Sequence, residues 1–235
     1  MKITILVPVL NEIEGMKKIM PLLKREWYDH LIIVDGGSTD GTLEYARQQG
    51  YFAFRQKKPG IRNAYMEAMQ YIEDESVIIT ISPDGNCILD LIPALTRKMA
   101  EGYDMVIISR YAGDAKSYDD TVTTSFGNWL FTSTINFLHR GHYTDAMGIY
   151  RGYRKGIVSE LDLDKDSGYT TPERLFHTKI SWEPLLSIRC AKRKLRVAEI
   201  PGDEPDRVGG VRKLQVVRWG AAYFFQCLRE VFFWK

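Results

Sequence analysis

Apolar runs alternate with amphipathic segments along the first 110 residues. The segments between the runs are spaced as helices, at residues 12–25, 40–47, 60–72 and 91–100. The runs themselves are short and mostly β-branched or aromatic, as is typical of buried strands, at residues 2–9, 31–34, 51–54, 77–81 and 103–109. This βαβαβ alternation predicts an α/β fold with a doubly wound, mostly parallel sheet.

Local signals refine two of these helices. Pro21 lies inside the first predicted helix and favours a kink or an early stop. Asp40 is a plausible N-cap for the helix that runs through Arg47, and Gly50 would end that helix.

The second half of the chain is less regular, and we find no repeat, low-complexity tract or linker in it. A single domain of residues 1–235 is therefore predicted, with parts at about 1–110, about 111–212 and 213–235. Beyond residue 110 the pattern predicts a polar loop (110–124), an apolar helix (126–138), a short strand around 147–150, a basic run (189–196), a loop rich in Gly, Pro and Asp (201–210) and an aromatic helix (about 213–233).

Composition narrows the class of protein. A chain of 235 residues can bury one substantial core, and a net charge of +2 gives no electrostatic reason to expect a nucleic-acid partner. Cys87, Cys190 and Cys227 show no CxxC spacing, so we expect packing residues in a reducing compartment. We expect no signal peptide before the first strand, and the uncharged stretch 219–228 is too short to span a bilayer. The predicted location is cytoplasmic, with peripheral attachment to the cytoplasmic membrane face as an extension.

Acidic and small residues follow three of the predicted strands, at residues 8–12 (PVLNE), 34–42 (VDGGSTDGT) and 82–86 (SPDGN). Ligands of open α/β sheets bind beyond the carboxyl ends of the strands. Neither a GxGxxG turn after the first strand nor a GxxxxGK[ST] loop is present. Carboxylates at this edge suit hydrogen bonds from a base or ribose and a hard divalent cation.

Taken in order, these patterns resemble family-2 glycosyltransferases of the GT-A fold, and most closely the dolichol-phosphate mannose synthase group. Residues 8–12 and 34–42 look like the first two motifs of the family. Four further segments are similar to later motifs: residues 82–86, 108–111, 145–151, and 199–201 together with 206–210 and 213–214. The resemblance implies a nucleotide-sugar-binding N-terminal half, an acceptor-binding half, and a C-terminal amphipathic aromatic helix.

The resemblance also implies residue roles. Asp84, Asp145 and Arg110 would be catalytic, and Asp84 with Asn86 would hold Mg²⁺ or Mn²⁺. The metal motif of the family is Asp-x-Asp, and Ser82 replaces its first Asp, which weakens the site, although one carboxylate plus diphosphate oxygens can hold such an ion. The implied nucleotide-sugar-binding residues are Pro8, Leu10, Asn11, Glu12, Asp35, Gly36, Ser82, Pro83 and Asp84.

The acceptor decides what else the site needs. A sugar hydroxyl needs a positioned base, whereas a phosphate monoester is already ionised at pH 7 and needs cationic anchors. Candidate anchors for an acceptor phosphate are Arg110, Arg207, Arg212 and Lys213. Asp145 could act as a base for a hydroxyl, or orient an arginine or the acceptor phosphate.

The C-terminal helix has two interpretations. It can pack on its own core, or it can lie in a membrane interface with its aromatic rings at the headgroup level. The basic run 189–196 could face the same membrane surface or be a solvated face.

The leading hypothesis is an inverting transfer of a hexose from a UDP- or GDP-sugar to a polyprenyl (dolichyl or undecaprenyl) phosphate at the membrane surface. One alternative is transfer to a saccharide hydroxyl in surface-polysaccharide or lipopolysaccharide assembly. Another is a non-catalytic sugar-nucleotide-binding protein, suggested by Ser82. A nucleotidyltransferase is disfavoured because no basic glycine-rich loop follows the first strand.

Overall fold

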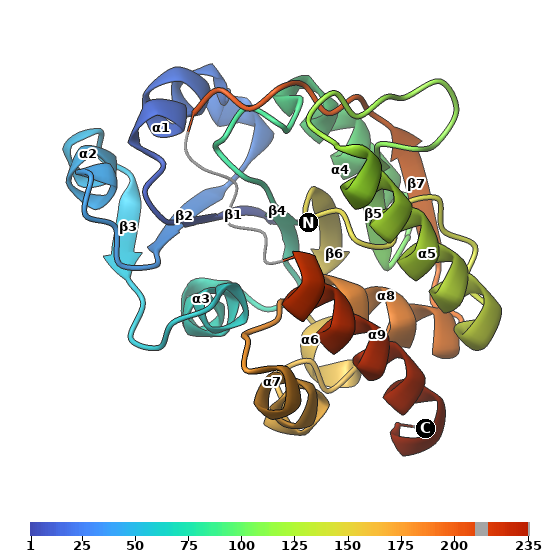
Figure 1. Cartoon of the computed structure of the whole chain (residues 1–235). Coiled ribbons are helices and arrows are strands. Elements are labelled where there is room, and N and C mark those ends of the chain that lie inside the picture. The colour runs from blue at the N-terminus through green and yellow to red at the C-terminus, as the bar shows by residue number, and fades with distance from the viewer. Residues whose placement is uncertain (210–215, 235) are drawn as a thin grey trace.

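A seven-stranded sheet lies at the centre of the computed structural model, which describes residues 1–209 and 216–234. The strand order is β3-β2-β1-β4-β6-β5-β7, and β6 is antiparallel to its two neighbours while the other pairs are parallel. The doubly wound, mostly parallel sheet is thus confirmed (Figure 1). The strands are β1 (Ile3–Val9), β2 (His30–Asp35), β3 (Phe52–Arg55), β4 (Val77–Thr80), β5 (Met105–Ser109), β6 (Arg151–Arg154) and β7 (Val197–Pro201).

Helices cover both faces of the sheet and divide the core in two. Because successive strand residues point to opposite faces, Ile5 and Val7 of β1 pack with α1, α2 and α4, while Leu6 packs with α3, α5, α8 and α9. The helices in the described residues are α1 (Ile13–Ile19), α2 (Thr42–Gln48), α3 (Ile61–Ala68), α4 (Ile92–Ala100), α5 (Val122–His139), α6 (Ile157–Glu160), α7 (Thr170–Phe176), α8 (Glu183–Lys192) and α9 (Val216–Phe233), with short 3₁₀ turns between some of them.

Two helix predictions need correction at their ends. The helix predicted over residues 12–25 stops at Ile19, and Pro21 lies in the 3₁₀ turn that follows, so the early-stop alternative holds. Gly41, and not Asp40, is the N-cap residue of α2. The Asp40 carboxylate instead accepts hydrogen bonds from the Thr42 and Ile13 backbone N–H groups, which joins α2 to the start of α1.

The strand predicted around residues 147–150 is wrong, because β6 begins at Arg151. The backbone N–H groups of Met147 and Gly148 donate to Asp145 Oδ1 at 3.4 and 3.2 Å. A side chain therefore takes the backbone groups that a sheet ladder would need, and regular pairing with β4 starts only after this turn.

The basic run 189–196 does not form one exposed face. Arg189 is buried, and its guanidinium donates to the Glu230 carboxylate of α9 at 2.8 and 3.1 Å. An arginine at this position therefore ties α8 to α9. The three cysteines are free and buried in the core, as the composition predicts.

The segment of residues 202–209, which we call the strap, runs from the end of β7 across the carboxyl edge of the sheet toward α1 (Figure 1). Its first residue donates to Ser109 at the end of β5, from Gly202 N to Ser109 O at 3.0 Å. Near its other end, Val208 N donates to Asp84 O at 2.7 Å. The strap thus joins the ends of β5 and β4 and roofs the edge at which ligands of such sheets bind.

Candidate active site

A cavity of about 410 Å³ opens beneath the strap, between the ends of β4 and β5 and the helices α5 and α9. We call it the acidic cavity, because six carboxylates and two arginines line it within the described residues. A diphosphate entering this negative field would be repelled unless a cation came with it. The acidic side chains are Asp84, Asp119, Asp120, Glu183, Asp203 and Glu204, and the arginines are Arg110 and Arg207.

Asp84 is buried in the turn that follows β4. Its Oδ1 accepts a hydrogen bond from Asn86 N at 3.2 Å, which fixes the carboxylate toward the cavity. Gly85 between them has a φ of +95°, and a Cβ there would lie 2.5 Å from Val208 Cγ2. Glycine is therefore required both by the backbone of this turn and by the strap seated on it.

Arg207 of the strap joins two strand ends. Its Nη2 lies 2.9 Å from Asp84 Oδ2, and its Nη1 lies 3.9 Å from Oε1 of Glu12, which follows β1. The guanidinium thus sits where carboxylates from two strands face each other. The sequence predicted an anchor for an acceptor phosphate at Arg207, and the structure brings it to the predicted donor side.

The described residues fit a hard divalent cation. Asn86 donates through Nδ2 to Asp119 Oδ2 at 3.0 Å, while its Oδ1 is buried without a hydrogen-bond partner in the described part of the chain. An amide oxygen and a carboxylate are ligands that Mg²⁺ and Mn²⁺ accept. Within residues 1–209 and 216–234 no three His, Cys, Asp or Glu side chains are grouped as a metal site. An ion here would therefore complete its shell with diphosphate oxygens and water.

Arg110 and Asp145 form a second pair at the β5 end of the cavity. Arg110 Nε and Nη2 donate to the two oxygens of Asp145 at 2.6 and 3.0 Å, and Nη1 lies 3.3 Å from Glu204 Oε2. Burial alone would raise the pKa of the Asp145 carboxyl, but Arg110 holds it below its usual range. Burial alone would lower the pKa of the Arg110 guanidinium, yet the carboxylates raise it well above its ordinary value. Both groups stay charged.

This geometry bears on the alternatives left open for Asp145. A carboxylate with a lowered pKa and two bonds to arginine is a weak base. Of the sequence-derived roles, orienting an arginine is the one the contacts favour. The assignments of Arg110 and Asp145 as catalytic, and of Arg110 as a phosphate anchor, stay predictions.

The predicted nucleotide-binding residues at the ends of β1 and β2 lie beside the acidic cavity without lining it. Asp35 is fully buried, and it accepts bonds from Gly37 N, Ser38 N and Arg55 Nε at 3.0 to 3.2 Å. It thereby shapes the turn that carries Gly36, whose N–H donates to Val9 O at 2.7 Å.

The loop after β1 is tied to the same turn. Asn11 N donates to Ser38 Oγ and Glu12 N to Thr42 Oγ1, at 2.8 and 2.9 Å. Pro8 lies one residue before the end of β1, and the Leu10 side chain is exposed. These residues build one surface at the carboxyl edge, and their role as a nucleotide pocket stays a prediction.

The third predicted nucleotide-binding segment follows β4. Ser82 lines the acidic cavity beside Asp84. The Pro83 carbonyl lies so close to Gly15 of α1 that a Cβ there would be 2.2 Å away. Arg212 and Lys213 lie outside the described residues.

Sequence reasoning missed Asp119 and Glu204. Both belong to loops that meet above the cavity, where Tyr118 N donates to Glu204 O and Glu204 N donates to Lys116 O. The signal was present as acidic clusters in the predicted loops 110–124 and 201–210. Nothing local distinguishes such clusters from solvated loop charges.

Comparison with known proteins identifies the class. Residues 4–162 match the family described as Glycosyl transferase family 2. The chain belongs to glycosyltransferase family 2. This family-2 chain is 25% identical over 231 residues to glycosyltransferase AglJ of Haloferax volcanii, covering 97% of this chain and 71% of that protein. It is 23% identical over 250 residues to the undecaprenyl-phosphate mannosyltransferase of Micrococcus luteus, covering 97% and 98%.

A solved structure confirms the GT-A fold of this glycosyltransferase. Glucosyl-3-phosphoglycerate synthase from Mycobacterium tuberculosis, in complex with Mn²⁺, UDP and phosphoglyceric acid, superposes with a TM-score of 0.67. The identity is 18%, with 96% of this chain and 78% of that chain covered. Family membership, together with the relatives named as glycosyltransferases, makes the protein a nucleotide-sugar-dependent glycosyltransferase, and the non-catalytic alternative is set aside.

Proposed function

We propose that this glycosyltransferase moves a hexose from a UDP- or GDP-sugar to a polyprenyl phosphate, with inversion at the anomeric carbon. The observation that carries the proposal is the mixed lining of the acidic cavity. Asp84 and Asn86 line it together with apolar side chains of α5 and α9, among them Phe131, Trp219 and Tyr223. Such a cavity suits a charged donor meeting an acceptor with an apolar tail.

The chemistry needs little from the protein beyond positioning and charge. The acceptor phosphate oxygen forms a bond to the anomeric carbon as the bond to the diphosphate breaks. A divalent ion held by Asp84 and Asn86 would stabilise the negative charge that grows on the leaving diphosphate. The acceptor is already ionised at pH 7, so no proton has to be removed. This agrees with Asp145 being committed to Arg110.

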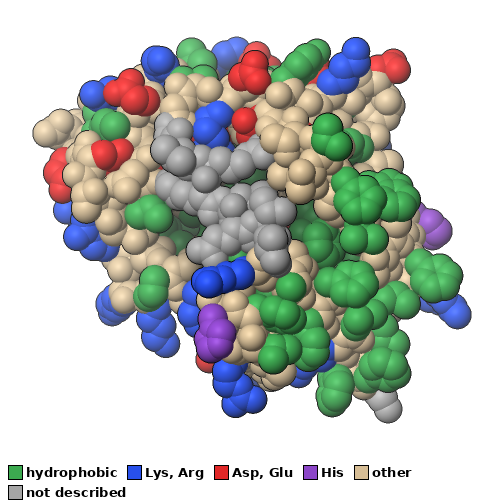
Figure 2. Space-filling model, viewed as in Figure 1, with side chains coloured by type: hydrophobic (Ala, Val, Ile, Leu, Met, Phe, Trp, Pro, Cys, Tyr) green, Lys and Arg blue, Asp and Glu red, His purple; other side chains and the backbone are tan. Residues whose placement is uncertain are grey.

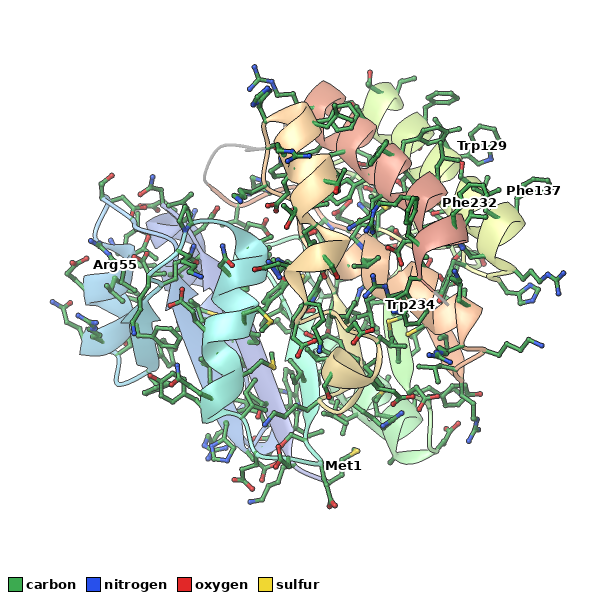
Figure 3. All side chains as sticks on the ribbon, turned by 90° about the horizontal axis from the view of Figure 1, so that it is seen from below. Met1, Arg55, Trp129, Phe137, Phe232 and Trp234 are labelled. Carbon is green, nitrogen blue, oxygen red and sulfur yellow. The ribbon has the colours of Figure 1, made fainter. Side chains whose placement is uncertain are left out.

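The exposed surface next to the cavity supports a lipid acceptor. Hydrophobic side chains gather over α5 and α9 (Figure 2), and Figure 3 shows Trp129 and Phe137 projecting from α5 on the opposite side from Arg55. Phe137 is 85% exposed, far more than a core-packing aromatic. The exposed apolar residues of this surface, which we call the aromatic face, are Val122, Phe126, Trp129, Leu130, Phe137, Phe224, Leu228, Val231, Phe232 and Phe233.

We place the aromatic face against the membrane interface, with the apolar rings at the headgroup boundary. The predicted C-terminal helix is one half of this surface, and α5 is the other half. The part of the chain that the structure describes holds no helix with the length and apolarity to cross a bilayer. A surface contact of this kind brings α5 and α9, which both contribute side chains to the lining of the acidic cavity, to the lipid.

The test is direct transfer. The purified protein is incubated with labelled UDP- and GDP-hexoses, Mg²⁺ or Mn²⁺, and vesicles carrying undecaprenyl phosphate or dolichyl phosphate. Label should move into the organic phase, and an otherwise matched reaction without lipid phosphate should stay aqueous. If no donor labels the lipid and a free saccharide acceptor is labelled instead, the proposal is wrong and the protein transfers to a saccharide hydroxyl.

A further inference from the structure

The contacts of Arg207 differ from those of an ordinary structural arginine. Its Nη2 lies 2.9 Å from Asp84 Oδ2, but its Nη1 lies 3.9 Å from Glu12 Oε1. The guanidinium therefore does not form the bidentate pair with a single carboxylate that is typical of arginine. Its Nε is buried without a hydrogen-bond partner in the described structure. A buried guanidinium N–H with no acceptor is costly. The arrangement therefore leaves one donor ready for an anion that is not part of the chain.

A matching acceptor lies beside it. Asn86 Oδ1, on the same turn as Asp84, is buried and also lacks a hydrogen-bond partner among the residues that the structure describes. The two groups are complementary, because Arg207 Nε is a hydrogen-bond donor and Asn86 Oδ1 is an acceptor. A cation on Asn86 and an anion on Arg207 would satisfy both at once.

The strap allows the Arg207 side chain to move while its backbone stays. Val208 N donates to Asp84 O at 2.7 Å, and the Val208 side chain rests on Gly85. These two contacts hold the backbone next to Arg207 whatever its guanidinium does. The long arginine side chain can therefore change partners by rotating its own bonds.

We propose that Arg207 is a positioning residue that occupies Asp84 as a resident cation until a divalent ion replaces it. The ion and the guanidinium cannot share Asp84 without like-charge repulsion. Arrival of the ion therefore turns the guanidinium away from Asp84, with Nε toward an entering phosphate. Binding of the donor with its divalent ion thereby orients Arg207 to bind the acceptor phosphate. The second half of this inference rests on the proposed phosphate acceptor, and the competition for Asp84 does not.

The competition is tested by Mn²⁺ binding alone, without lipid and without turnover. Free Mn²⁺ is counted by its electron paramagnetic resonance signal during titration of wild type and Arg207→Gln. The variant should bind Mn²⁺ roughly tenfold more tightly, which corresponds to losing one charge-assisted hydrogen bond to Asp84. An unchanged or weaker affinity in a folded Arg207→Gln protein overturns the proposal.

Arg154→Gln is the matched control. Arg154 pairs with Asp104 at 2.6 Å, away from the acidic cavity, so this variant also removes one ion-paired arginine charge. It should bind Mn²⁺ with the affinity of wild type. If its Mn²⁺ affinity rises as much as that of Arg207→Gln, the effect is due to the change in net charge and the proposal is overturned. If Arg207→Gln does not fold, Arg207→Lys takes its place. Lysine keeps the charge but not the fork, so a smaller gain is expected, and no gain counts against the proposal.

The coupling to the acceptor is measured in the wild-type protein with geranyl phosphate, a short soluble phosphate monoester. Mn²⁺ should tighten its binding in calorimetry, and geranyl phosphate should tighten Mn²⁺ by the same factor. In Arg207→Gln this factor should fall severalfold. The tightening that remains would come from direct contact between the metal and the phosphate. An equal factor in both proteins overturns the coupling. Loss of lipid labelling with intact Mn²⁺ competition would refute the proposed function and leave the role of Arg207 at Asp84 standing.

Discussion

Two arginine–carboxylate pairs face the same cavity, and they are built in opposite ways. Asp145 is fully buried, receives two bonds from Arg110 and also accepts from the backbone of Gly148. Asp84 receives one short bond from Arg207, which comes from a loop and not from the sheet. A pair with every donor and acceptor satisfied is a fixed part of the framework. A pair with an unfilled donor is one that a ligand can rearrange.

Asp84→Asn should show the largest effect and should show it on catalysis. Removing the charge that we propose to hold a divalent ion should lower kcat by about 10²- to 10³-fold, in the range seen when one group that stabilises developing charge is lost. The unfolding midpoint should fall less than that of Asp145→Asn, because Arg207 makes one short contact with Asp84 whereas Arg110 makes two hydrogen bonds to Asp145. Kinetics with lipid phosphate and thermal unfolding measure the two effects. Asp90→Asn, an exposed residue on the same stretch of chain, is the control.

Asp145→Asn should reverse that pattern and cost stability. Breaking a buried ion pair leaves Arg110 with Glu204 as its remaining carboxylate, and the free energy of unfolding should fall by about 3 kcal/mol. Chemical denaturation measures this loss. If Asp145 were instead a catalytic base, turnover would vanish while the unfolding free energy stayed at the wild-type value, and the comparison between the pairs would fail.

Acid should weaken the Asp145 pair. The folded-state pKa of Asp145 is lowered, chiefly because Arg110 outweighs the effect of burial. Its contribution to stability is therefore fully present above the unfolded pKa of about 3.9 and is lost as pH falls through the lower folded value. The unfolding free energy of wild type should drop faster below about pH 4 than that of Asp145→Asn. Parallel curves for the two proteins would contradict the assignment.

The smallest expected effect concerns the aromatic face, which lies outside both pairs. Replacing Trp129 and Phe137 by Ser removes two exposed rings and should weaken binding to vesicles with anionic lipid about tenfold. Sedimentation with vesicles measures this change. Leu22→Ser, a change at an apolar residue that is 62% exposed but not on the aromatic face, should leave vesicle binding unaltered. Mn²⁺ binding should be the same in all three proteins.

The first half of the fold was open to prediction because its signals are local. The strands β1, β2 and β4 are short apolar runs rich in β-branched residues, and β3 is marked by its phenylalanines. Asp84 stands out because it follows such a run. Residues 147–150 misled the same reasoning. The Asp145 side chain accepts the backbone N–H groups of Met147 and Gly148, and the apolar pattern of the segment does not reveal this contact.

The sequence by itself determined the family, the doubly wound sheet and the edge at which the chemistry lies, because periodicity and motif order are properties of short stretches. Only the tertiary structure decided which charges meet. Arg189 looked like part of a basic surface and is buried against Glu230, and Arg207 looked like an acceptor anchor and lies against Asp84. The physical reason is that three-dimensional proximity between distant segments decides which residues form an ion pair. Burial then decides how much that pair contributes to the free energy of folding.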